Sequence, residues 1–124
     1  MKREIFDRYA TAIANRFNLT LDEMFAKNKR RDSVDARQML YFLSRERPIR
    51  ISYIQKFMEE NGHIVTHSTI IHGYNKAKES IDNDQDYAEV VNMIKNVSKA
   101  DVAFIKRSLR FTKKNKELND KDTN

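Results

Sequence analysis

Hydrophobic side chains recur every three or four positions along most of this chain, which is the spacing of one buried face of an α-helix. In residues 4–17 the series is Ile5, Tyr9, Ile13 and Phe17. The same period continues downstream and predicts seven helices, at residues 4–17, 21–25, 34–47, 53–61, 66–81, 85–97 and 99–111.

Residues that favour helix ends stand at several of these predicted boundaries. Thr20 begins a segment with the spacing of a capping box. Ser33 and Thr66 are N-cap residue types that precede the third and fifth helices. Pro48 cannot continue the third helix, and Gly62 suits the C-terminal end of the fourth.

The composition favours an all-α fold. The 124 residues include only two Gly and one Pro, fewer turn-forming residues than a β-sandwich or barrel of this length usually carries. The chain has no Cys, which excludes disulfides and thiol catalysis. No apolar run approaches the roughly 20 residues of a membrane span, so we expect no membrane partner and a cytoplasmic, nucleoid-associated or phage-encoded protein. We expect a helical domain at 1–97, a C-terminal helix at 98–111 and a flexible basic tail at 112–124.

Positive charge is concentrated in two segments, although the net formal charge is only +6. Residues 27–56 hold nine Lys or Arg against three acidic residues, and residues 106–124 hold seven against three. Residues 79–101 hold two basic residues against six acidic ones. Such clustering is typical of a surface that binds a polyanion, and the alternative is a solvated lysine-rich surface.

The helix predicted from Thr66 has a polar face of unusual composition. Its apolar stripe consists of Ile70, Ile71, Tyr74, Ala77 and Ile81, and on a helical wheel the opposite arc holds Ser68, Thr69, His72, Asn75, Lys76 and Glu79. Side chains of these types can exchange hydrogen bonds with base edges in a DNA major groove, and the helix N-terminus offers N–H groups to phosphate. The alternative is an ordinary amphipathic helix with a solvated face.

The histidines and acidic residues do not form a convincing metal or catalytic motif. His67 and His72 are five positions apart rather than four, and no Cys completes a ligand set. Asp82, Asp84 and Asp86 lack the Gly and Glu that a calcium loop requires after them. We therefore expect no metal, no cofactor and no enzymatic activity.

Two short motifs resemble the C-terminal DNA-binding domain of the DnaA replication initiator family. Residues 66–72, Thr-His-Ser-Thr-Ile-Ile-His, are similar to the motif at the recognition helix of that domain, and Ala36-Arg37-Gln38-Met39 is similar to a step upstream of it. The resemblance covers roughly residues 5–95 and implies a Trp-repressor-like helical domain with a helix-turn-helix, followed here by a C-terminal helical extension. The chain has no Gly-x-x-x-x-Gly-Lys phosphate loop, which favours a stand-alone DNA-binding module over an initiator ATPase.

The resemblance also implies roles for individual residues. It assigns His67, Ser68, Thr69 and His72 to the major groove, Arg31 to the minor groove, and Arg37, Gln38, Ser52 and Tyr53 to phosphates. A basic loop is expected at residues 27–31, between the second and third predicted helices. This basic loop and the polar helix face add six expected DNA-binding residues: Lys27, Lys29, Arg30, Thr66, Asn75 and Lys76. His67 also lies near the buried arc of the wheel, so a core position is its alternative. Val65-Thr66 replaces an Arg-Asp pair of the family and the turn at 61–65 looks about two residues longer, which leaves the DNA target open.

The leading expectation is therefore sequence-specific binding of double-stranded DNA, as an accessory factor in replication or transcription. The alternative is a protein-interaction or structural module that keeps the fold and assembles through its C-terminal helices, as a homodimer or with another protein. Its support is the supply of apolar side chains there, namely Tyr87, Val90, Ile94, Val102, Ile105 and Leu109.

Overall fold

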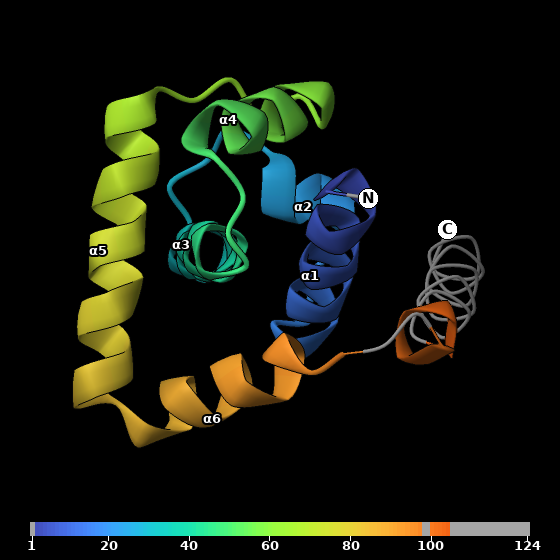
Figure 1. Cartoon of the computed structure of the whole chain (residues 1–124), viewed down its shortest axis with the longest axis vertical. Coiled ribbons are helices and arrows are strands. Elements are labelled where there is room, and N and C mark those ends of the chain that lie inside the picture. The colour runs from blue at the N-terminus through green and yellow to red at the C-terminus, as the bar shows by residue number, and fades with distance from the viewer. Residues whose placement is uncertain (1, 98–99, 105–124) are drawn as a thin grey trace, which may run out of the picture.

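The computed structural model describes residues 2–97 and 100–104, and every regular element in these ranges is an α-helix (Figure 1). The all-α class is confirmed for this part of the chain. The six bounded helices are α1 Lys2–Arg16, α2 Leu21–Phe25, α3 Arg31–Glu46, α4 Ile51–Glu60, α5 His67–Asn83 and α6 Gln85–Lys95. Residues 100–104 are also helical, whereas the remainder of the helix predicted at 99–111 and the tail predicted at 112–124 lie outside the described residues. None of the described helices is long and apolar enough to cross a membrane.

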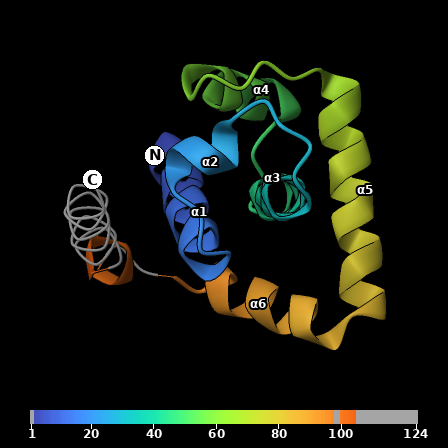
Figure 2. The ribbon, with the colours of Figure 1, turned by 180° about the vertical axis from the view of Figure 1, so that it is seen from behind.

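Helix α3 occupies the middle of the fold. Both ribbon views show α3 end-on, with α1, α4, α5 and α6 arranged around it (Figures 1 and 2). Its Ala36, Met39 and Leu40 side chains are fully buried, and its most extensive contacts are with α5 and α1. Burial of one such Leu or Met side chain contributes about 1.5–3 kcal/mol, so α3 is the main source of core stability and fixes the position of α5.

Two of the predicted N-cap residues, Thr20 and Thr66, cap their helices. The Thr20 hydroxyl accepts from the Glu23 amide at 3.1 Å, and the Glu23 carboxylate accepts from the Thr20 amide at 3.0 Å, which completes the capping box of α2. The Thr66 hydroxyl accepts from the Thr69 amide at 3.1 Å and caps α5. Gly62 has a φ of +86°, a conformation that glycine adopts without strain, and it turns the chain after α4.

Three predicted helix starts were wrong. Helix α1 begins at Lys2 rather than at residue 4. Helix α3 begins at Arg31, and Ser33 lies inside it as a fully buried residue whose hydroxyl donates to the Glu23 carbonyl at 3.2 Å. That hydrogen bond joins α3 to α2, so the hydroxyl is not used as a cap. Helix α4 begins at Ile51 rather than after Ser52, because the extended backbone of Arg50 precedes it without a side-chain cap.

The predicted apolar stripes were right in part. On α5 the buried positions are Ile70, Gly73 and Ala77, whereas Ile71 is 46% exposed and does not belong to the stripe. On α6 the fully packed residues are Val91 and Ile94. The predicted helix at 85–97 ends two residues early, at Lys95.

Candidate nucleic-acid interface

The polar residues predicted on α5 share one exposed face. All six members of the predicted arc are exposed: Ser68, Thr69, His72, Asn75, Lys76 and Glu79. On the opposite side of the helix, Ile70 and Ala77 have no exposed surface, and Tyr74 and Ile81 are partly buried. His67 is also exposed, so the alternative of a core position for it was wrong. It is the first residue of the helix, and the neighbouring core positions are taken by Val65 and Ile70 instead.

The start of α5 is ordered by two threonines. The hydroxyls of Thr66 and Thr69 lie 2.9 Å apart and share a hydrogen bond, in addition to the cap on the Thr69 amide. These hydroxyls therefore orient each other. A helix cannot satisfy the first N–H groups of its own backbone, so the exposed start of α5 can donate hydrogen bonds to an anion.

Arg37 is a structural residue, and the expectation that it approaches phosphate was wrong. Only 6% of the residue is exposed. Its guanidinium donates to the carbonyls of Met24 at 2.7 Å, Ala26 at 3.1 Å and Asn28 at 2.9 Å. Burial lowers the pKa of this guanidinium, although arginine stays protonated in proteins. Arg37 thus holds the basic loop in place from the inside.

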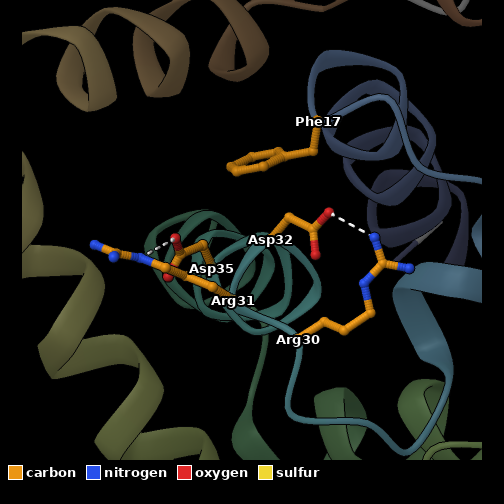
Figure 3. Close-up of a pocket in the computed structure, with 5 residues that line it drawn as sticks. All are labelled: Phe17, Arg30, Arg31, Asp32 and Asp35. Carbon is orange, nitrogen blue, oxygen red and sulfur yellow. Dashed lines mark hydrogen bonds and ion pairs between the residues drawn. The ribbon is translucent and has the colours of Figure 1, made fainter.

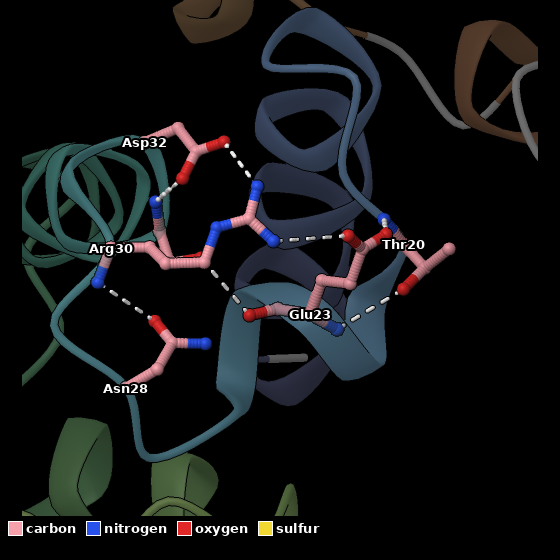
Figure 4. A network of polar contacts seen from close by, with 6 residues as sticks. Thr20, Glu23, Asn28, Arg30 and Asp32 are labelled. Atoms are coloured by element: carbon pink, nitrogen blue, oxygen red, sulfur yellow. Dashed lines mark hydrogen bonds and ion pairs between the residues drawn. The ribbon is translucent and has the colours of Figure 1, made fainter.

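The basic loop presents its charges unequally. Arg30 lies between two acidic residues, 3.2 Å from the Asp32 carboxylate and 3.8 Å from that of Glu23 (Figure 4). Arg31 leaves the start of α3 in the opposite direction, with 96% of its side chain exposed and only a 4.0 Å contact to Asp35 (Figure 3). Exposed pairs of this kind contribute little, so Arg31 can exchange its partner for a phosphate more readily than Arg30.

Lys27 and Lys29 are exposed on the same loop, and neither forms an ion pair among the residues that the structure describes. They supply the remaining accessible charge of the loop.

His63 joins the basic loop to the turn between α4 and α5. Its Nδ1 lies 3.1 Å from the Phe25 carbonyl, at the end of α2, and the charges of Arg37 and Lys27 act on its ring. The loop at 26–30 and the turn that leads into α5 are therefore neighbours. This contact brings the predicted loop residues and the predicted helix face to one region of the molecule.

The start of α4 lies next to α5. Arg45, Ile51, Ile71 and Asn75 line a pocket of about 250 Å³, so Arg45 stands beside the polar face of α5. Sequence reasoning missed Arg45, because helical spacing does not reveal which exposed cation of one helix lies near another helix.

Three further residues were predicted to bind phosphate, Gln38, Ser52 and Tyr53, and they lie on two different helices. Ser52 and Tyr53 are exposed at the start of α4, and the Lys2 Nζ lies 4.3 Å from the centre of the Tyr53 ring. Lys2 was also missed, since nothing in the sequence pairs it with a residue so far along the chain. Gln38 is half-buried where α3 crosses α5, with its Cγ next to the space that a Gly73 side chain would fill.

Comparison with protein-family models, with curated proteins and with solved structures found no match to this chain. Among the described residues, no three His, Cys, Asp or Glu side chains are grouped as metal ligands would be.

His63 should make the stability of this region depend on pH. Burial, followed by the charge of Arg37, lowers its pKa, while the hydrogen bond to Phe25 acts weakly in the other direction. The unfolded chain therefore takes up this proton first as the pH falls. Stability is highest above the unfolded pKa of about 6.5 and decreases as the pH falls below it.

We expect the urea midpoint to fall between about pH 7.5 and about pH 5.5 by more in the wild type than in His63→Gln. The exposed His72→Gln is the matched control and should retain the wild-type dependence. Parallel pH profiles for the wild type and His63→Gln would contradict this role.

Proposed function

We propose that this chain binds double-stranded DNA sequence-specifically, with α4, the turn at 61–66 and α5 acting as a helix-turn-helix. The observation that carries the proposal is the exposed polar face of α5. Arg45 lies beside this face, and the basic loop lies next to the turn that leads into α5. The resemblance of residues 66–72 to the DnaA recognition-helix motif supports it further. We also propose a Trp-repressor-like fold, a role as an accessory factor in replication or transcription, and no enzymatic activity.

The proposed contacts divide into base readout and phosphate binding. Ser68, His72 and Asn75 point outward from α5 and offer donors and acceptors of a size that suits base edges. Lys27 and Arg31 supply charge that can neutralise phosphates without distinguishing one sequence from another. Both sets are needed, because phosphate contacts supply affinity and base contacts supply specificity.

The direct test is a fluorescence-anisotropy titration of the protein with a pool of random duplexes, followed by sequencing of the retained DNA. We expect affinity to fall by one or more orders of magnitude between about 50 mM and about 200 mM salt, because bound cations are released from the DNA. We also expect one sequence motif to be enriched. Binding without enrichment would leave a general DNA-coating protein, and no binding at low salt would refute the proposal.

His72→Ala should separate base readout from general affinity. We expect about tenfold weaker binding to the enriched sequence and unchanged binding to random duplex, because a good base contact contributes discrimination alone. The double variant Lys27→Ala/Lys29→Ala should weaken both equally and reduce the salt slope by about two.

Arg16→Ala is the control for loss of one positive charge. Arg16 is exposed at the end of α1 and lies outside the proposed interface. Its removal should leave binding nearly unchanged. Equal weakening of enriched and random DNA by His72→Ala would argue against base readout by α5.

Association through the C-terminal part of the chain is the second candidate function. Met93 on α6 is 69% exposed and Phe104 is 71% exposed, so both offer apolar surface that a second protein can cover. Static light scattering over a range of concentrations distinguishes a monomer from a homodimer, and it can be combined with the DNA titration because a dimer would bind paired half-sites.

A further inference from the structure

A cavity of about 460 Å³ lies away from the proposed DNA-binding face. It is bounded by α1, α3, α6 and the end of α5, in the part of the fold where α6 runs from the end of α5 to α1 (Figure 1). Its volume falls within the range of small-molecule sites. Much of its wall is apolar and is provided by Phe42, Leu43, Ile81, Ala88 and Val91.

One end of this cavity is positively charged. Arg47 and Lys95 line it, and together with Arg8 they also line a small adjoining hollow. None of the three cations forms an ion pair within the described part of the chain. The Nε of Arg8 is buried and has no hydrogen-bond partner there. Arg8 therefore adds a positive charge beside the cavity, and an anionic group held at Arg47 and Lys95 would offset the mutual repulsion of the three cations.

Helix ends explain only part of this cluster. Arg47 follows the last residue of α3 and Lys95 is the last residue of α6, positions where a cation offsets the helix dipole. Arg8 lies in the middle of α1, where no such effect applies. The acidic residue on the wall, Glu46, accepts a hydrogen bond from the Tyr74 hydroxyl at 3.3 Å, on the α5 side of α3.

We propose that this cavity binds a small amphiphilic carboxylate, with its apolar body against Phe42 and Val91 and its head group at Arg47 and Lys95. The apolar wall matches the body, and arginine and lysine donors match a carboxylate. The site is separate from the α5 face, so it stands or falls independently of DNA binding.

Isothermal titration calorimetry on the full chain tests the site with decanoate and with decanol, two probes that share an apolar body and differ in head group. We expect saturable one-to-one binding of decanoate with a dissociation constant below about 1 mM, and at least about tenfold weaker binding of decanol. No decanoate binding at about 5 mM, or equal binding of the two probes, would overturn the proposal.

Three variants locate the bound molecule. Arg47→Gln and Lys95→Gln should each weaken decanoate binding by about tenfold and leave decanol binding unchanged, because each removes a charged donor. Ala88→Phe should abolish binding of both probes, because it fills the cavity and leaves the charges in place. Arg16→Gln, a charge removed outside both hollows, should change nothing. Unaltered decanoate affinity in Arg47→Gln and Ala88→Phe would show that decanoate binds elsewhere and would refute this site.

Discussion

Replacement of Arg37 by Leu is expected to lower the free energy of unfolding by about 3 kcal/mol. The leucine fills the apolar part of the space but donates no hydrogen bond. The carbonyl of Met24 is then left buried without a partner, and that of Asn28 loses its bond to Arg37. The Ala26 carbonyl keeps only the hydrogen bond from the Asn28 amide. Burying the Arg37 charge costs free energy in the wild type, and the leucine variant avoids that cost. The expected loss of stability is therefore smaller than the sum of the three lost hydrogen bonds.

Urea denaturation followed by circular dichroism measures this loss. Arg37→Lys should restore only part of the stability, since one ammonium group cannot reach three carbonyls from the positions that a planar guanidinium reaches. Arg16→Leu is the control, because Arg16 is an exposed helical arginine outside the proposed interface. An unchanged urea midpoint in Arg37→Leu would contradict the structural role of this side chain.

Arg37 shows where sequence reasoning stops. The cap residues Thr20 and Thr66 were predicted correctly, because a cap depends on neighbours within three positions along the chain. The hydrogen bonds of Arg37 reach residues 9 to 13 positions away and depend on how a loop folds back on α3. An arginine on a helix is usually exposed, so nothing local indicated its burial.

The sequence predicted only approximately which side of α5 faces the solvent. The polar arc of α5 was placed correctly, yet Ile71 and His67, at the edge between the two arcs, were not resolved by the wheel. Which residues at the edge of the α5 polar arc are exposed depends on how α3 packs against the opposite side of α5. The stack of Phe42 on Tyr74, with ring centres 5.4 Å apart, is part of the crossing of α3 and α5 that fixes this rotation.

The role of Gly73 in α5 is visible only in the structure. A glycine within a helix costs about 1 kcal/mol relative to alanine, so sequence alone marks Gly73 as a weak point. In the fold, Gly73 is buried where α3 crosses, and a Cβ built on it would lie 2.6 Å from Cδ2 of Tyr41. The absence of a side chain allows the two helices to approach closely.

Gly73→Leu is therefore expected to destabilise the fold by about 3 kcal/mol, despite the better helix propensity of leucine. Tyr41 is only 3% exposed, so its ring has little space to move aside. The helices must separate instead, with loss of contacts between α3 and α5. Glu79→Leu, an exposed position of the same helix, should change the stability by less than about 0.5 kcal/mol.

A double-mutant cycle distinguishes this steric cause from a general effect on α5. Tyr41→Ala alone should cost about 3 kcal/mol through the cavity that it leaves. In Gly73→Leu/Tyr41→Ala the new leucine can occupy that cavity, so the double variant should be more stable than the sum of the single effects predicts, by at least about 1 kcal/mol. Simple additivity would mean that Tyr41 is not the obstacle. The close approach at Gly73 would then not be what holds α5, and its polar face, in place on α3.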